Sequence, residues 1–192
     1  MTKRFSLSNA AHDIIREYLR EGMAAIDATL GNGHDTAFLA QCVGLSGHVY
    51  GFDIQAQAVQ ATQARLQRQG LEGQTRLFQA SHAEMPDLIP QVQHGRIQAV
   101  MFNLGYLPGG DKAVITRSES TLRALNAACG LLAVHGVMTV MAYPGHAGGD
   151  DETDAVERWA QVLDSAQFQH RIILSQHHRT GAPRLFVIRK LR

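Results

Sequence analysis

Residues 23–35 read MAAIDATLGNGHD, and this stretch decides the fold of the 192-residue chain. A short apolar run ends at Asp27, two glycines flank Asn32, and a helix-forming segment follows directly. The order predicts a strand, a tight loop and the start of a helix. Gly31 and Gly33 let the backbone approach a ligand closely, and the first turn of the helix offers unpaired N–H groups. The stretch therefore predicts a loop that binds a nucleotide-like cofactor, with an ordinary Gly-Asn-Gly turn as the alternative.

The candidate cofactors require different residues in this loop. A phosphate-binding P-loop ends in Gly-Lys-Ser/Thr, which does not occur here, and a dinucleotide fingerprint needs a third glycine where Thr36 stands. Asp27 and Asp35, the latter at the expected helix N-cap, would repel a pyrophosphate but attract amine and sulfonium cations. Asp53 ends a second apolar run, where an acid can hold two ribose hydroxyls. In this order and spacing, the residues favour S-adenosylmethionine.

Composition limits the class of protein. With 45% hydrophobic residues, the chain can bury a substantial core, and we expect one domain over residues 1–192. Its apolar runs are too short for a signal peptide or a membrane span, which predicts a cytoplasmic protein. A net charge of +1 excludes a grossly basic nucleic-acid binder but allows a local basic patch. Cys42 and Cys129 lack Cys-x-x-Cys spacing, so we expect reduced thiols.

Strand and helix patterns alternate along most of the chain. Strands are expected over residues 23–28, 47–53, 75–80, 97–102 and 136–142, with helices over 35–43, 55–69 and 118–134. A first helix, from Ser8 or Asn9 to Arg20, is expected to cover an edge of the sheet. The segments 168–175 and 184–189 predict an antiparallel pair. The fold class is therefore α/β, with a doubly wound, mostly parallel sheet.

In such a sheet ligands bind at the carboxyl ends of the strands, where Asp27, Asp53, Ser81 and Asn103 would converge. The long glycine-rich loop that begins at Asn103 is typical of a binding loop. No metal site is predicted. His177 and His178 are adjacent and would point to opposite faces of an extended segment. A cluster of acidic residues is interpreted as the beginning of a helix, where the helix dipole favours negative charge. The cluster consists of Asp150, Asp151, Glu152 and Asp154.

Four strings together resemble a known family. They are DATLGNGHDT (27–36), FDIQ (52–55), SH (81–82) and FNLGYLPGGDK (102–112). They are similar to the small bacterial class I methyltransferases labelled "putative rRNA methylases", among them enzymes that methylate 5-aminomethyl-2-thiouridine at the tRNA wobble position. The resemblance implies a Rossmann-like seven-stranded sheet, S-adenosylmethionine as cofactor and a homodimer. It implies cofactor contacts from the matching positions, which are Asp27, Gly31, Asn32, Gly33, Asp35, Asp53, Gln55, Ser81, His82 and Asn103.

Methyl transfer to an amine requires a group that orients the free base, since a primary alkylamine is mostly protonated at neutral pH. Asn103 is expected to accept a hydrogen bond from the amine, Asp111 to accept its proton, and Tyr106 to stack on a nucleobase. Alternatively, Asn103 only completes the strand end, Asp111 is a turn residue and Tyr106 packs in the fold. The expected substrate is the tRNA anticodon loop, with rRNA, a small amine, or a silent cofactor-binding module as alternatives. Four cations are candidates for phosphate contacts: Lys112, Arg117, Arg179 and Arg184.

Overall fold

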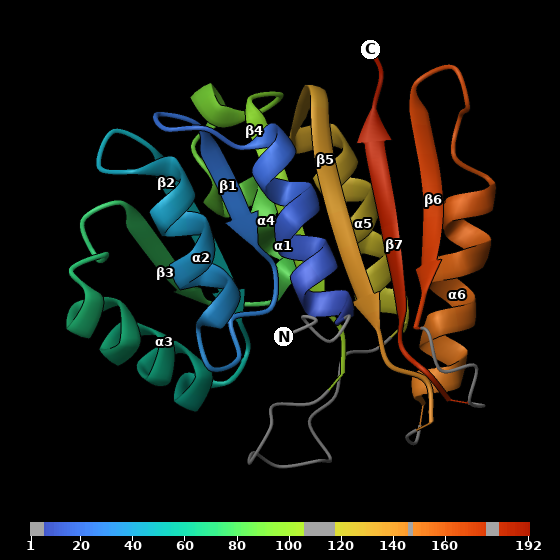
Figure 1. Cartoon of the computed structure of the whole chain (residues 1–192), viewed down its shortest axis with the longest axis horizontal. Coiled ribbons are helices and arrows are strands. Elements are labelled where there is room, and N and C mark those ends of the chain that lie inside the picture. Colours follow the sequence, from blue (N-terminus) through green and yellow to red (C-terminus); the bar gives the residue numbers. More distant parts are fainter. Residues whose placement is uncertain (1–5, 106–117, 146–147, 176–180) are drawn as a thin grey trace, which may run out of the picture.

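The computed structural model describes residues 6–105, 118–145, 148–175 and 181–192. These residues form one seven-stranded sheet in the order β3-β2-β1-β4-β5-β7-β6 (Figure 1). The first five strands are parallel, and β7 runs antiparallel to both β5 and β6. The strands are β1 (Ala24–Asp27), β2 (His48–Asp53), β3 (Thr75–Gln79), β4 (Ile97–Asn103), β5 (Leu132–Ala142), β6 (Phe168–Leu174) and β7 (Arg184–Lys190).

Helices cover both faces of the sheet, as the buried strands require. β1 is buried along its whole length, as expected of a central strand that has helices on both sides. One face carries α1 (Leu7–Tyr18), α2 (His34–Val43) and α3 (Ala56–Gln69), and the other carries α4 (Met85–Leu88), α5 (Ser118–Leu131) and α6 (Gly149–Gln161). Two short 3₁₀ helices, η1 (His82–Glu84) and η2 (Gln91–Gln93), lead into α4 and β4.

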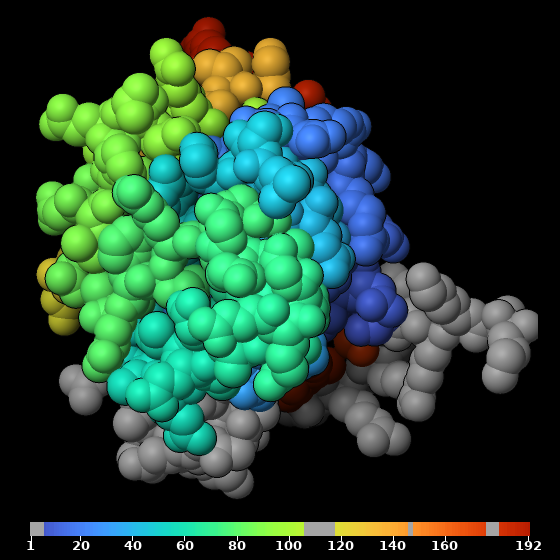
Figure 2. Space-filling model, turned by 90° about the vertical axis from the view of Figure 1, so that its left-hand side faces the viewer, coloured from blue at the N-terminus to red at the C-terminus, as the bar shows by residue number. Residues whose placement is uncertain are grey.

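Two apolar layers separate the helices from the sheet. Ile15, Leu39 and Val49 belong to the layer under α1 to α3, while Phe52 and Phe102 belong to the layer under α4 to α6. Successive strand residues therefore alternate between the two cores. Figure 2 looks onto the β3 edge, where residues of α3 and β3 fill the centre of the face and α1 lies to the right.

The expected fold class and the antiparallel C-terminal strands are confirmed, but three local predictions are wrong. The first helix packs on a face of the sheet, over β4, β5 and β7, and not over an edge. The helix expected to reach Val134 ends at Leu131, because Leu132 already pairs with Ile97 of β4. The α2 N-cap is Gly33, at φ 75°, so Asp35 lies within the first turn of the helix.

Gly70, at φ 65°, ends α3, and its N–H bonds to the last turn of the helix. Cys42 and Cys129 are free thiols, and burial raises the pKa of Cys129 to about 12. None of the described helices has the length and apolar character needed to cross a bilayer.

Candidate active site at the carboxyl edge of the sheet

The carboxyl ends of β1, β2 and β4 bring three predicted polar residues to one edge of the sheet. Asp27 ends β1, Asp53 ends β2 and Asn103 ends β4. β1 lies between β2 and β4, so the loop that follows β1 lies between the other two ends. The edge therefore has the position at which doubly wound sheets bind ligands.

Asp27 is fully buried, and both of its carboxylate oxygens are engaged. Oδ1 accepts from the backbone N–H of Thr29 at 3.1 Å, and Oδ2 accepts from the hydroxyl of Thr36 at 2.6 Å. Burial, and then the charge of Asp35, raises the pKa of Asp27 well above the ordinary value for aspartate. The geometry thus makes Asp27 a brace across the glycine loop, from its first residues to the first turn of α2.

The glycine loop is held from two sides. The N–H of Gly31, at φ 51°, donates to Asp53 Oδ2 at 3.1 Å, and the other oxygen of Asp53 accepts from Gln55 N–H at 2.9 Å. Gly33 packs so closely on α3 that an added Cβ would lie 2.8–2.9 Å from atoms of Thr62. A side chain at position 33 would therefore push α3 away, and it would also be strained at this φ.

Asp35 connects α1 to the end of β4. The ring Nε2 of His12, in α1, donates to Asp35 Oδ1 at 2.6 Å, and Asn103 Nδ2 donates to Oδ2 at 3.4 Å. The His12 ring stacks on Phe38 with centroids 3.9 Å apart and planes 7° apart. The stack holds the imidazole flat on α2, so His12 reaches Asp35 in a fixed orientation.

Asn103 is further positioned through its backbone. Its N–H donates to Thr29 Oγ1 at 2.7 Å, and the following N–H, of Leu104, donates to the carbonyl of Met141 in β5 at 2.8 Å. Because a carboxylate only accepts hydrogen bonds, the group that Asn103 turns toward Asp35 must be its NH₂. The carboxamide oxygen then points away from Asp35, and the side chain is exposed.

Ser81 and His82, after β3, support the edge from below. Ser81 caps η1: its hydroxyl accepts from Ala83 N–H at 3.2 Å, and its own N–H donates to Glu84. His82 is 8% exposed, and its Nδ1 hydrogen-bonds to the carbonyl of Ala28 at 3.2 Å. Burial lowers the pKa of His82 from its ordinary value. Nδ1 is the donor in this contact, because a carbonyl oxygen only accepts. His82 therefore acts on the loop after β1 through the backbone of Ala28.

Asn32 lies exposed at the tip of the glycine loop. Arg65 of α3 donates from Nε to the carbonyl of Asn32 at 2.7 Å, and its Nη2 lies 3.0 Å from His34 Nε2. The predicted residues Tyr106 and Asp111 lie outside the described residues. The same holds for three of the proposed phosphate contacts and for the histidine pair, which are Lys112, Arg117, Arg179, His177 and His178.

Arg184, the fourth proposed phosphate contact, is paired with carboxylates of α6. Its guanidinium contacts Glu157 directly and lies 3.7 Å from Asp154. Asp150, Asp151 and Glu152 lie in the first turn of the same helix, as expected for residues that favour its positive end. The charge of Arg184 is therefore already balanced within the fold.

Four residues that support the site were not predicted from the sequence: His12, Thr29, Thr36 and Arg65. His12 lies on a helix expected at the edge of the sheet, and its spacing from residue 35 carries no local signal. The two threonines do have a signal. Both lie inside the DATLGNGHDT string at positions from which a short hydroxyl side chain can reach the strand end. Arg65 could be found only once α3 was known to pack against the loop.

Two similar solved structures carry the names of a methylase and a methyltransferase. The chain superposes on a putative rRNA methylase from Clostridium thermocellum with a TM-score of 0.92 and 38% identity, over 100% of both chains. It superposes on a putative methyltransferase from Streptococcus mutans, solved in complex with SAH, with a TM-score of 0.87 and 33% identity, again over 100% of both chains. Fold, carboxyl-edge site and these likenesses define an enzyme class, the S-adenosylmethionine-dependent methyltransferases.

Sequence comparison narrows the class to a family. The profile described as "Putative rRNA methylase" matches residues 49–189. A protein of Arabidopsis thaliana named tRNA (mnm(5)s(2)U34)-methyltransferase, chloroplastic, is 38% identical over 168 residues, which is 83% of this chain. The chain spans 61% of the length of that relative. The chain belongs to the putative rRNA methylase family.

Proposed function

We propose that the enzyme methylates the 5-aminomethyl nitrogen of the wobble uridine, or 2-thiouridine, in tRNA. The observation that carries the proposal is the orientation of Asn103. Its NH₂ is held by Asp35 at 3.4 Å and its backbone by Thr29 at 2.7 Å, so its carboxamide oxygen is left to accept a hydrogen bond. An acceptor at this place suits an amine nucleophile, because a neutral amine has N–H groups to donate. The 38% identical relative named for such a reaction supports this choice of substrate.

The cofactor, when bound, supplies a methyl group on an activated sulfonium. The residues proposed to hold it directly surround the glycine loop and the strand ends: Gly31, Asn32, Gly33, Asp35, Asp53, Gln55 and Ser81. Asp27 and His82 are proposed to act through the loop, because their polar atoms already bind Thr29, Thr36 and Ala28. The half-buried carboxylate of Asp53 has lone pairs beyond its two backbone contacts, and these can accept from ribose hydroxyls.

The proposed reaction is an in-line displacement. The amine nitrogen forms a bond to the methyl carbon as the bond from carbon to sulfur breaks, and the nitrogen then gives up a proton. In this proposal the carboxamide oxygen of Asn103 aligns the amine, and Asp111 accepts the proton that the amine releases. The nucleobase stacks on the ring of Tyr106. The protein's contribution is then mainly alignment, and the His12–Asp35–Asn103 chain of contacts provides it.

The proposal also covers the partner and the assembly. The tRNA anticodon loop is the proposed partner, with phosphates contacted by Lys112, Arg117 and Arg179. A cytoplasmic homodimer completes the proposal, and light scattering during size-exclusion chromatography would measure the dimer. A monomer at assay concentrations that methylates tRNA at full rate would contradict that part alone.

The substrate is tested by nucleoside mass spectrometry of total tRNA and rRNA from a deletion strain. We expect 5-aminomethyl-2-thiouridine to accumulate in tRNA and its methylated form to disappear, with rRNA unchanged. A plasmid carrying the parent gene should restore the methylated form, and one carrying Asn103→Ala should not. Loss of a methyl group from rRNA instead would favour the second candidate function, an rRNA methyltransferase. The description of the family, putative rRNA methylase, supports this candidate.

A further inference from the structure

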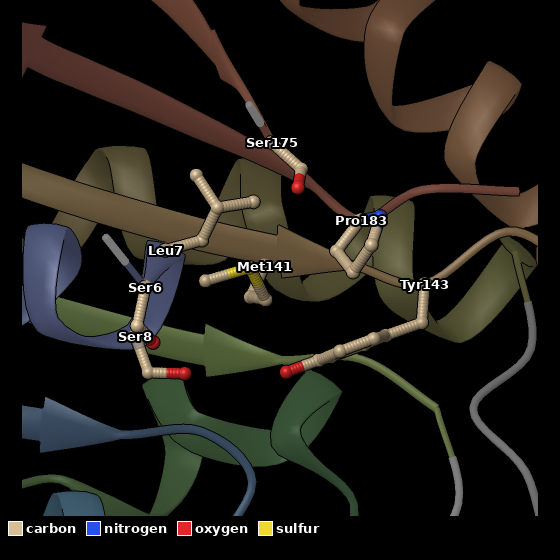
Figure 3. Close-up of a pocket in the computed structure, with 7 residues that line it drawn as sticks. All are labelled: Ser6, Leu7, Ser8, Met141, Tyr143, Ser175 and Pro183. Carbon is tan, nitrogen blue, oxygen red and sulfur yellow. The ribbon is translucent and has the colours of Figure 1, made fainter. Parts of the chain in front are cut away.

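A cavity of about 330 Å³ lies at the carboxyl edge of the sheet, between the first turn of α1 and the ends of β5, β6 and β7. Figure 3 shows the ring of Tyr143 reaching from the end of β5 toward Ser8, so that the two hydroxyl groups face one another. The side chain of Met141 lies between them and β7.

The cavity lies on the far side of Asn103 from the glycine loop. In the sheet, β4 separates β1 and β2 from β5 and β7. Met141, which lines the cavity, is the register partner of Asn103 in β5. Burial, and then the charge of the Asp35 carboxylate, raises the pKa of the Tyr143 phenol. An in-line displacement needs the nucleophile and the sulfur on opposite sides of the methyl group, so a group in this cavity is on the correct side of Asn103.

The chemistry of the lining selects the occupant. The described lining residues carry no charge: Leu7, Met141 and Pro183 are apolar, and Ser8, Tyr143 and other hydroxyls supply donors and acceptors. A phosphate would need Lys, Arg or a set of converging N–H groups. The methionine end of the cofactor carries both an ammonium and a carboxylate, which are costly to bury without charged partners. A flat, uncharged ring with polar edges fits apolar walls combined with hydroxyl groups.

We infer that this cavity receives the base of the acceptor nucleotide, with the Ser8–Tyr143 hydroxyl pair on the hydrogen-bonding edge of that base. The inference rests on the proposed function in one respect, that the acceptor is a nucleoside. It adds a site on α1 and β5 to the proposed catalytic residues on β4 and the loop after it.

Binding is tested directly by NMR of protein labelled with ¹³C at the tyrosine rings. The chain has four tyrosines, and Tyr143→Phe identifies the signal of Tyr143 by its loss. We expect uridine and 5-aminomethyluridine, added to protein saturated with adenosylhomocysteine, to shift the Tyr143 signal. Tyr18 lies in the last turn of α1 and should not respond. Inorganic phosphate, the control probe, should leave the Tyr143 signal in place.

Two pairs of variants test the same site in turnover. Tyr143→Phe should raise the KM for the RNA acceptor about two- to tenfold with kcat nearly unchanged, the range expected for one lost hydrogen bond. Tyr18→Phe is its control. Ser8 is exposed, so Ser8→Phe leaves the core intact while it fills the cavity, and acceptor binding should be lost with adenosylhomocysteine binding retained. Asn9→Phe, at the neighbouring exposed position, should retain binding of both the acceptor and adenosylhomocysteine.

The outcomes separate this inference from the proposed function. If nucleosides shift Tyr143 and Ser8→Phe abolishes the shift, the cavity binds a base even when aminomethyluridine is not methylated; that result would overturn the proposed substrate alone. If aminomethyl tRNA is methylated at the parent rate by Ser8→Phe and Tyr143 does not respond to any nucleoside, the base binds elsewhere and the inference fails.

Discussion

Asp53 ends β2 with one oxygen on Gly31 N–H and the other on Gln55 N–H. In Asp53→Ala the glycine loop loses its anchor, and the ribose hydroxyls lose a charge-assisted acceptor. We expect calorimetry with adenosylhomocysteine to show binding weakened by about 1.5–3 kcal/mol. Asp53→Asn keeps one acceptor oxygen, so its affinity for adenosylhomocysteine should lie between those of the parent protein and Asp53→Ala. Asp87→Ala, at an exposed position in α4, is the control. An unchanged affinity in Asp53→Ala would remove Asp53 from the cofactor site.

Asn103 separates catalysis from cofactor binding. Its side chain contacts Asp35 and is exposed at the end of β4, where it can hold the acceptor amine but reaches little of the cofactor. We expect Asn103→Ala to leave the affinity for S-adenosylmethionine within a few fold and to lower single-turnover methyl transfer by roughly two to four orders of magnitude. Near-normal turnover would exclude the amine-orienting role, and a large loss of cofactor affinity would move Asn103 into the cofactor pocket.

Single residues were predictable from the sequence where chemistry and position coincide. Asp27, Asp53 and Asn103 each follow an apolar run, so their place at the strand ends follows from the strand pattern alone. For Asp27 the sequence leaves two roles open, contact with a cofactor amine or support of the loop from Gly31 to Gly33. The structure buries its carboxylate against two threonines and raises its pKa, which favours support of the loop. Burial depends on how α2 packs, and the local sequence does not specify that packing.

At the scale of elements, α1 connects the sheet to the site. His12 stacks on Phe38 and donates to Asp35, which in turn holds Asn103. We expect His12→Ala to lower kcat about tenfold through misalignment of Asn103, with adenosylhomocysteine affinity within about threefold of the parent. His12→Gln keeps a donor and should recover part of the rate. Asp13→Ala, on the exposed face of the same helix, is the matched control. If His12→Ala lowers only the melting temperature, and kcat measured well below it is unchanged, His12 has a structural role alone.

The position of α1 shows why elements were easier to predict than their packing. The spacing of four apolar residues identifies an amphipathic helix: Ile14, Ile15, Tyr18 and Leu19. Three of them are buried, and Tyr18 is half-buried. The same stripe would suit an edge or the centre of a sheet, since both present an apolar surface. The choice of β4, β5 and β7 is made by tertiary contacts between segments far apart in the chain. For the same reason His12 was not recognised as a neighbour of residue 35.

At the scale of the whole molecule, charge distinguishes cations that can bind RNA from cations used within the fold. Arg184 is paired with Glu157 and Asp154, whereas Lys112 is a proposed phosphate contact. We expect Lys112→Gln to reduce the slope of log affinity for tRNA against log salt by about one. Arg184→Gln should leave the slope unchanged, because its charge is already compensated. Equal slopes for Lys112→Gln and the parent protein would mean that Lys112 makes no phosphate contact.

The overall topology was the most predictable level. Alternating strand and helix patterns allow few arrangements once crossovers are right-handed, and the observed order, β3-β2-β1-β4-β5-β7-β6, is one of them. The exact start of β5 was not predictable. Leu131 and Leu132 are both buried and suit either a helix or a strand, and pairing with Ile97 decides between them.

The placement of β7 has a consequence for how the protein is made. β7 is the last strand in chain order, yet it lies between β5 and β6 (Figure 1). While the ribosome is still adding residues before Arg184, β6 has no ladder partner and the outer edge of β5 is open. Unpaired strand edges of this kind recruit other chains. A ribosome that stalls in this interval would therefore release a product prone to aggregation and proteolysis, and not a shortened enzyme with partial activity.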